Sequence, residues 1–359
     1  MPDKIFLHEL HFKKPAGTSR GILYTKPSWI FSYELPNGLI AQTEFPIIPG
    51  LSPEFIDRTQ YESKLNFFLN EVRPMILSWS ATDFFTNASF LDLIAKWRDY
   101  PSFIFGLEVL MLAIKAKGSN ILFDTPFTRQ ENTIPINGLV WMGTLAEMRS
   151  QALEKIAAGF QTVKLKIGAL DWPEELRLLQ ELRANAPHLT IRVDANGAFQ
   201  RSEVLDKLKK LSDLRIHSIE QPIAANQQEA MREVCALSPL PIALDEELIG
   251  CFDKADRAAL LDKIKPQYII LKPTLLGGFK SCEEWIELAK ARSIGWWITS
   301  ALESNLGLNA IAQWTYNLEP HSFQGLGTGG LFTNNIEAPL EVDSGYLKFN
   351  PKLNWNLNF

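Results

Sequence analysis

The sequence has few cysteines and histidines, and this scarcity argues against several kinds of metal and redox site. Its three cysteines, Cys235, Cys251 and Cys282, form no CxxC spacing and cannot all pair with one another. The five histidines show no spacing typical of metal ligands. Because unpaired thiols suit a reducing compartment, we expect a cytoplasmic protein without a thiolate metal site.

Long apolar runs and clusters of basic residues are also missing. The first residues contain no apolar stretch of the length that a secretory signal needs. The most apolar long segment, 103–114, is interrupted by Glu108 and is shorter than the roughly 20 residues that span a bilayer. The net charge is −5, without any run of Lys and Arg. We therefore expect a soluble protein with no membrane or nucleic-acid partner.

The first third of the chain has the pattern of an α+β domain. The 359 residues, of which 46% are hydrophobic and 21% charged, suffice for two domains or one large barrel with an addition. Strands are predicted at 4–13, 20–33 and 39–44, and helices at 54–73, 86–99 and 102–117. We place this domain at 1–130. Its loops around 18–21 and 49–52 are candidate lids.

From residue 131 the chain alternates between strands and helices. Strands are predicted at 136–142, 162–167, 189–194, 216–220, 241–245, 267–272 and 295–299, with a weaker one near 322–325. Helical patterns fill the gaps between them. About eight such repeats indicate a closed barrel of parallel strands, which we place at 131–334. The tail, 335–359, is expected to pack back on the first domain.

Charged residues end five successive predicted strands. In chain order they are Lys164 and Lys166, then Asp194, Glu220, Asp245 and Lys272. The carboxyl ends of barrel strands meet at one rim, where active sites lie. Three carboxylates gathered there need a cation, and ligand sets made only of oxygen favour Mg²⁺ or Mn²⁺. Helix N-capping by the carboxylates is the competing interpretation.

The lysines add a proton-transfer function to this rim. Lys164 and Lys166 are two residues apart, so their side chains share one face of the strand. The like charge of Lys164 and partial burial should lower the pKa of Lys166 and suit it to act as a general base. Lys272 would face this pair across the cavity. A cation that binds a substrate carboxylate acidifies the neighbouring C–H, so the pattern indicates proton abstraction next to a carboxylate.

The order and spacing of these motifs resemble a known superfamily. The motifs are Lys-x-Lys at 164–166, Asp-Ala-Asn at 194–196, Glu-Gln-Pro at 220–222, Asp-Glu at 245–246 and Lys-Pro at 272–273. Together they resemble the enolase superfamily, in its muconate-lactonizing-enzyme subgroup. Segments 49–54, 271–278 and 300–308 most resemble the o-succinylbenzoate synthases of that subgroup. The resemblance implies a modified TIM-like (β/α)7β barrel with an N-terminal α+β capping domain.

The resemblance also implies a reaction and its residues. The reaction is the Mg²⁺-dependent syn dehydration of 2-succinyl-6-hydroxy-2,4-cyclohexadiene-1-carboxylate to 2-succinylbenzoate, a step of menaquinone biosynthesis. Asp194, Glu220 and Asp245 would bind the metal. Lys166 would remove the α-proton and then protonate the departing hydroxyl. Lys272 would stabilise the enediolate, and Lys164 would lower the pKa of Lys166.

Residues that hold the substrate are expected around the same rim. Ser300 and Ser304 are candidates to bind the succinyl side chain, although helix N-capping would also account for Ser304. Arg192 lies two residues before Asp194 and resembles an arginine that supports the site in part of the family, and a structural ion pair is the competing interpretation. Asn196, in the Asp-Ala-Asn motif, is a fourth predicted contact.

Two other functions fit parts of the same pattern. A racemase of N-acylamino acids or a dipeptide epimerase would use one lysine on each face of its substrate. Dipeptide epimerases of this subgroup carry Asp-x-Asp after strand eight, but residues 325–328 here contain no carboxylate. A barrel that binds ligands without turnover is the second alternative. The expected partner is a small-molecule carboxylate, and the sequence leaves open whether the chain forms homo-oligomers.

Overall fold

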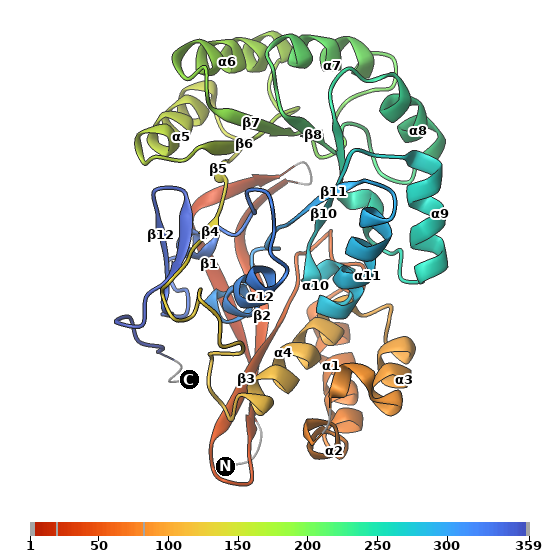
Figure 1. Cartoon of the computed structure of the whole chain (residues 1–359), viewed down its shortest axis with the longest axis vertical. Helices are drawn as coiled ribbons and strands as arrows, with labels where there is room; N and C mark the ends of the chain where they lie inside the picture. The colour runs from red at the N-terminus through yellow and green to blue at the C-terminus, as the bar shows by residue number, and fades with distance from the viewer. Residues whose placement is uncertain (1–3, 19–20, 82, 357–359) are drawn as a thin grey trace.

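The computed structural model describes residues 4–18, 21–81 and 83–356 (Figure 1). The chain begins with an antiparallel sheet of β1 (Lys4–Thr18), β2 (Gly21–Glu34) and β3 (Ile40–Pro46), with β2 in the middle. A turn at Pro36-Asn37-Gly38 joins the last two strands, and Gly38 adopts a φ of +80° that glycine tolerates best. This sheet is the β part of the predicted α+β region.

Helices follow the sheet and cover it. They are α1 (Arg58–Val72), α2 (Ile76–Ser80), the 3₁₀ turn η1 (Phe84–Thr86), α3 (Ala88–Lys96) and α4 (Pro101–Lys115). The short α2 had no counterpart in the sequence prediction. Helix α4 is apolar on all sides and buried from Pro101 to Ile114, as expected for a helix enclosed by other elements. It contacts β3, α10 and α11. Among the described residues no helix is long and apolar enough to cross a bilayer.

The second part of the chain is built on a curved sheet of seven parallel strands. In spatial order, which is also chain order, they are β5 (Gly138–Val140), β6 (Thr162–Lys166), β7 (Thr190–Asp194), β8 (Ser218–Glu220), β9 (Ile242–Leu244), β10 (Tyr268–Leu271) and β11 (Gly295–Ile298). The predicted eighth strand is reduced to Gln324 and Gly325. Their parallel bridges to Ile136 and Thr299 connect the first and last strands of the sheet.

Helices connect the strands and lie outside them, in an arc that runs from α5 to α9 in Figure 1. They are α5 (Leu145–Ala157), α6 (Trp172–Asn185), α7 (Val204–Asp213), α8 (Gln228–Leu237), η2 (Glu246–Leu248), α9 (Lys254–Ile264), α10 (Pro273–Leu276), α11 (Gly278–Lys290), α12 (Asn305–Asn317) and η3 (Gly329–Leu331). The one-turn helix α10, directly after Lys272, was not predicted. The predicted fold class is confirmed, and the strand ends form one rim.

The loop predicted between the first two strands is mostly strand. Strand β1 continues to Thr18 after an irregularity between His11 and Ala16, so the predicted end of this strand at residue 13 is wrong. The candidate lid at 18–21 includes residues 19–20, which lie outside the described residues. The adjoining Gly17 forms an antiparallel bridge with Met142, beside the barrel mouth. A Cβ on Gly17 would lie 3.0 Å from the Met142 Cβ and carbonyl oxygen, so a larger residue here would require Met142 to shift.

The tail contacts both parts of the molecule. Strands β12 (Leu340–Asp343) and β13 (Tyr346–Phe349) form a small antiparallel sheet with β4 (Ile134–Pro135), which lies just before the barrel. Ile336 of the tail packs with Ile30 of β2, and just before the tail the Thr333 N–H donates to the His11 carbonyl of β1 at 2.9 Å. The predicted domain limits stay a prediction.

A buried glutamate connects α4 to the barrel. The Glu108 carboxylate accepts hydrogen bonds from the backbone N–H groups of Phe279 and Lys280 at the start of α11. Gly278 makes room for it, because a Cβ there would lie 2.3 Å from Glu108 Oε2. Burial outweighs these hydrogen bonds and raises the pKa of Glu108 to about 8.

This raised pKa predicts how Glu108 affects stability as pH changes. Between pH 4.5 and 8 the unfolded chain loses the Glu108 proton while the folded chain keeps it, so the folded state loses stability as pH rises. Glu108→Gln removes this dependence. We expect the melting temperature of the variant minus that of the native protein to rise by several degrees between pH 5 and pH 8. Exposed Glu287→Gln, also on α11, is the control, and a difference that is constant with pH would contradict the prediction.

Candidate active site

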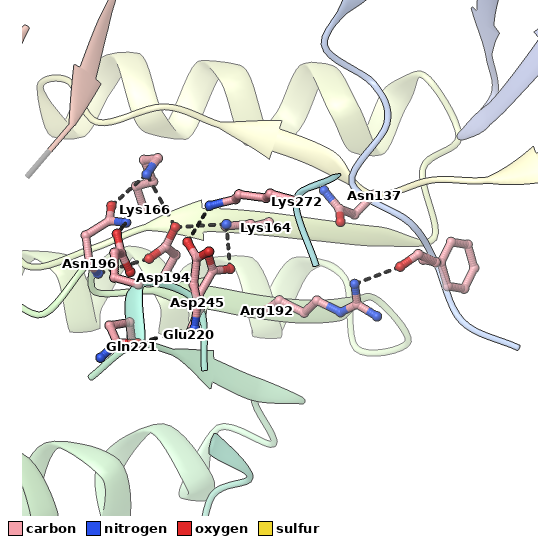
Figure 2. Close-up of polar contacts among 12 residues, drawn as sticks. Asn137, Lys164, Lys166, Arg192, Asp194, Asn196, Glu220, Gln221, Asp245 and Lys272 are labelled. Carbon is pink, nitrogen blue, oxygen red and sulfur yellow. Dashed lines mark hydrogen bonds and ion pairs between the residues drawn. The ribbon is translucent and has the colours of Figure 1, made fainter. Parts of the chain in front are cut away.

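The register of three neighbouring strands aligns the predicted catalytic residues. Lys166 at the end of β6 lies opposite Asp194 on β7, and Asp194 lies opposite Glu220 on β8. Asp245 follows β9 directly. The three carboxylates are between 1% and 3% exposed and point toward one another in Figure 2. Lys272, after β10, reaches the same cluster. The structure therefore brings the predicted carboxylates and lysines together.

Lys164 and Lys272 form the shortest ion pairs with the carboxylates, and Lys166 forms a longer one with Asp194. Lys164 Nζ lies 2.8 Å from Asp194 Oδ2 and 2.5 Å from Glu220 Oε2, and Lys272 Nζ pairs with Asp245 (Figure 2). Burial alone would lower the pKa of Lys164, but the charges of Asp194 and Glu220 outweigh it and raise that pKa. Lys164 thus forms ion pairs with both Asp194 and Glu220. Its proposed effect on Lys166 stays a prediction.

Lys166 has further contacts outside the carboxylate cluster, with Asn196 and Trp141. Its Nζ donates to Asn196 Oδ1 at 2.6 Å and lies 3.3 Å from Asp194 Oδ2. The Asn196 amide in turn donates to Glu246 Oε1 at 3.1 Å. The Trp141 ring centroid is 5.8 Å from the Lys166 ammonium, within cation–π range. These contacts orient Lys166, and they place Asn196 beside the predicted base.

The carboxylates have the chemistry of a site for a hard cation. Glu220 Oε1 is buried and has no hydrogen-bond partner among the described residues. Burial and the neighbouring charge of Asp194 raise the pKa of Glu220 well above its usual value, so positive charge is needed to keep it ionised. In the described part of the chain no three His, Cys, Asp or Glu side chains are arranged to hold a metal ion. Lys164 and Lys272 take oxygens of the carboxylates that a cation would need.

A pocket opens above these charges, between the N-terminal sheet and the rim of the barrel. Its polar lining comprises Asn137, Lys164, Lys166, Asp194, Asn196, Glu246, Lys272, Thr299, Ser300 and Thr328. Its apolar lining comprises Leu23, Ile48, Leu51, Leu139, Trp141, Ala301 and Leu302. Residue 51 belongs to the second predicted lid, and residue 48 lies directly before it. The pocket thus combines a charged floor with apolar walls, as small-molecule sites do.

One of the two predicted serines lines this pocket. Ser300 Oγ lies 2.7 Å from Thr328 Oγ1 and accepts a hydrogen bond from the Leu302 N–H at 3.0 Å. Leu302 adopts a φ of +64°, unusual for a residue with a branched side chain. Ser304 does not line the pocket. It is the N-cap of α12, accepts from the Leu306 N–H, and donates to Glu44 Oε2 at 2.5 Å.

Arg192 also lies away from the pocket. In Figure 2 its side chain is directed away from Lys166, and its Nη1 donates to the Phe323 carbonyl at 2.8 Å. The guanidinium carbon lies 4.0 Å from the centroid of the Trp297 ring, which gives that bulky strand residue a stacking partner. Burial lowers the pKa of Arg192 to about 10. The sequence predicted correctly that Arg192 and Asp194 share one face of β7. It did not predict that the Arg192 side chain lies inside the barrel, away from the pocket.

Several residues of the pocket were missed. Thr299 follows β11, so its position at the carboxyl end of a strand was a usable signal. Asn137 precedes β5, at the opposite end of a strand, and had no such signal. Glu246 follows Asp245 in the Asp-Glu motif, but nothing in the sequence indicated that it would contact Asn196. Trp141 and Leu302 are apolar loop residues, which sequence alone does not distinguish from ordinary core.

Comparisons with known proteins agree with this geometry. The family model described as "Enolase C-terminal domain-like" matches residues 147–352, more than half of the chain. An o-succinylbenzoate synthase from Desulfotalea psychrophila is 46% identical over 94% of this chain and 96% of its own length. The crystal structure of MenC from D. psychrophila LSv54 matches with a TM-score of 0.82 at 43% identity, covering 96% of this chain and 99% of that one.

More distant relatives share the fold. A structure of the dipeptide epimerase from Enterococcus faecalis V583, complexed with Mg and the dipeptide L-Leu-L-Tyr, has a TM-score of 0.80 at 17% identity. It covers 97% of this chain and 96% of that one. At that identity the likeness concerns the fold alone. The match to the D. psychrophila protein spans nearly the whole of both chains, and the chain therefore belongs to the o-succinylbenzoate synthase family of the enolase superfamily.

Proposed function

We propose that this chain is an o-succinylbenzoate synthase, a hydro-lyase that dehydrates 2-succinyl-6-hydroxy-2,4-cyclohexadiene-1-carboxylate to 2-succinylbenzoate in menaquinone biosynthesis. The main observation in favour of this proposal is that Lys166 and Lys272 line one pocket, next to the three buried carboxylates. The 46% identical relative of that name supports the substrate. Three free cysteines suit a cytoplasmic protein, and the pocket suits a small-molecule carboxylate.

Lys166 is the proposed base. The neutral amine can donate one hydrogen to Asn196 Oδ1 and still direct its lone pair at a substrate C–H bond. The C–H bond next to the carboxylate breaks, and the proton moves to Lys166 Nζ. The C–O bond to the hydroxyl group then breaks, and the same Nζ returns the proton to release water. A single lysine acting on one face of the ring accounts for syn elimination.

Lys272 and the carboxylates complete the proposed site. Lys272 lines the pocket and keeps its positive charge, because Asp245 and Glu220 outweigh the effect of burial and raise its pKa. That charge stabilises the negative charge that develops on the substrate. Asp194, Glu220 and Asp245 are the residues that would hold Mg²⁺, or Mn²⁺ in its place. When bound, the cation would supply further stabilisation of the substrate carboxylate as its α-proton leaves.

Replacement of the base tests this function. The native protein with Mg²⁺ should form 2-succinylbenzoate, followed by absorbance, and Lys166→Ala should lower kcat by about 10² to 10⁴-fold, the usual contribution of a general acid–base group. Lys209→Ala, at an exposed lysine on α7, is the matched control and should behave like the native protein. Equal turnover by Lys166→Ala and the native protein would refute the assignment of the base.

Glu220 provides a test of the metal site. We expect Mg²⁺ to raise the melting temperature of the native protein, since a ligand at 100 times its Kd stabilises the folded state by about 2.7 kcal/mol. Glu220→Gln removes a charge and one ligand oxygen, so its melting temperature should respond much less. Glu233→Gln, on the exposed side of α8, is the control. An equal response of Glu220→Gln and the control would contradict the assignment.

Racemisation of N-acylamino acids is the second candidate function. The observation in its favour is that Lys166 and Lys272, from strands far apart in the sheet, line one pocket, as proton transfer on both faces of a carbon requires. The measurement is uptake of solvent deuterium at the α-carbon of an N-succinylamino acid, compared with dehydration on the same preparation. Deuterium uptake without dehydration would move the proposed function to racemisation.

A further inference from the structure

A buried glutamate on α6 holds the loop that follows the proposed base. The loop runs from Ile167 to Asp171, between β6 and α6. The Glu175 side chain turns back from the first turn of α6 and accepts hydrogen bonds from three consecutive backbone N–H groups. Gly168 donates to Oε1 at 2.8 Å and to Oε2 at 2.9 Å, and Ala169 and Leu170 donate to Oε1 at 3.1 and 3.0 Å.

The position of Glu175 differs from that of an ordinary helix-end glutamate. It is 2% exposed, whereas Glu174 beside it is exposed to solvent. A negative charge in the first turn normally serves the N–H groups of its own helix. Here the N-cap residue Asp171 makes no side-chain capping bond, and the Glu175 carboxylate is used entirely on the preceding loop. Its hydrogen bonds therefore fix the loop as well as the start of α6.

The loop in turn fixes Lys166 at its backbone. Ile167 N–H donates to the Asp194 carbonyl at 2.8 Å, so the chain is tied to β7 immediately after Lys166. Gly168 has a φ of +95° and lies so close to the next loop that a Cβ on it would be 2.6 Å from Ala198 Cβ. Ala198 is two residues beyond Asn196, whose Oδ1 accepts a hydrogen bond from Lys166 Nζ. The two loops that orient Lys166 are thus packed on each other.

From this arrangement, and resting on the proposed function, we infer that Glu175 is a positioning residue for the dehydration. Its carboxylate holds residues 168–170 so that Lys166 Nζ stays at the α-carbon of the substrate. Lys166 lines the pocket, and Glu175 does not, so Glu175 acts only through the backbone of the loop. A displacement of about 1 Å in a reacting group can lower a rate about 10²-fold, which is large enough to measure.

The variants follow from the four hydrogen bonds. Glu175→Ala removes all of them. Glu175→Gln keeps the oxygen that accepts from all three N–H groups and places an N–H group where Oε2 accepts the second hydrogen bond of Gly168. Ala169 is exposed, and Gly168 and Leu170 are partly exposed, so water can replace the lost partners and the variants should fold. The neighbouring Glu174→Gln, at an exposed position, is the matched control.

Two readouts separate positioning from simple stability. We expect Glu175→Ala to lower kcat by about 10²-fold, with KM changed far less, and Glu175→Gln to have a smaller effect of the same kind. Hydrogen exchange measured by mass spectrometry should show faster exchange of the 168–170 amides in both variants, while Glu174→Gln matches the native protein. If Glu175→Ala does not fold, Glu175→Gln carries the test.

Each result has a defined meaning. An unchanged kcat in folded Glu175 variants, with native protein and Glu174→Gln both active, would overturn the inference and leave the proposed function intact. A fall in melting temperature without a fall in kcat, measured below that temperature, would also overturn it. Absence of dehydration by the native protein would refute the proposed function instead, and the hydrogen-exchange result would then show only whether Glu175 holds the loop.

Discussion

The site depends on one electrostatic constraint. Asp194, Glu220 and Asp245 are buried side by side, and three negative charges in such a place are stable only if positive charge is placed among them. In this structure Lys164, Lys166 and Lys272 supply it. The same negative charge makes the site suitable for a divalent cation. The lysines and a bound cation would therefore both compensate the negative charge of the three carboxylates.

The sequence was sufficient to predict those parts of the molecule that local pattern determines. Alternating strands and helices fix a parallel barrel, and charged residues at strand ends must then meet at its rim, which is why Lys166 and Asp194 were placed correctly. Contacts between distant segments were beyond such reasoning. Ser304 could cap α12 or face the substrate, and only the structure shows that its Oγ accepts from the Leu306 N–H as the cap and donates to Glu44 of β3. Glu175 looks like any solvated helix-end residue until the loop before it is seen.

The N-terminal domain takes part in the site through a few polar contacts with the barrel. Glu44 accepts hydrogen bonds from Ser304 and from the Gly307 N–H at the start of α12, directly after the turn that carries Ser300. Glu108 does the same at the start of α11. In both places a buried carboxylate of one part satisfies a helix N-terminus of the other. Such contacts hold the apolar residues of the N-terminal sheet, including Leu23, over the pocket.

The central claim is that Lys166 breaks a C–H bond next to a substrate carboxylate in a dehydration. The most direct test is the single-turnover rate of 2-succinylbenzoate formation by the native protein with Mg²⁺, using substrate that carries either hydrogen or deuterium at the α-carbon. We expect product from both substrates and a slower reaction of the deuterated one. No product, or equal rates for the two substrates, would contradict it.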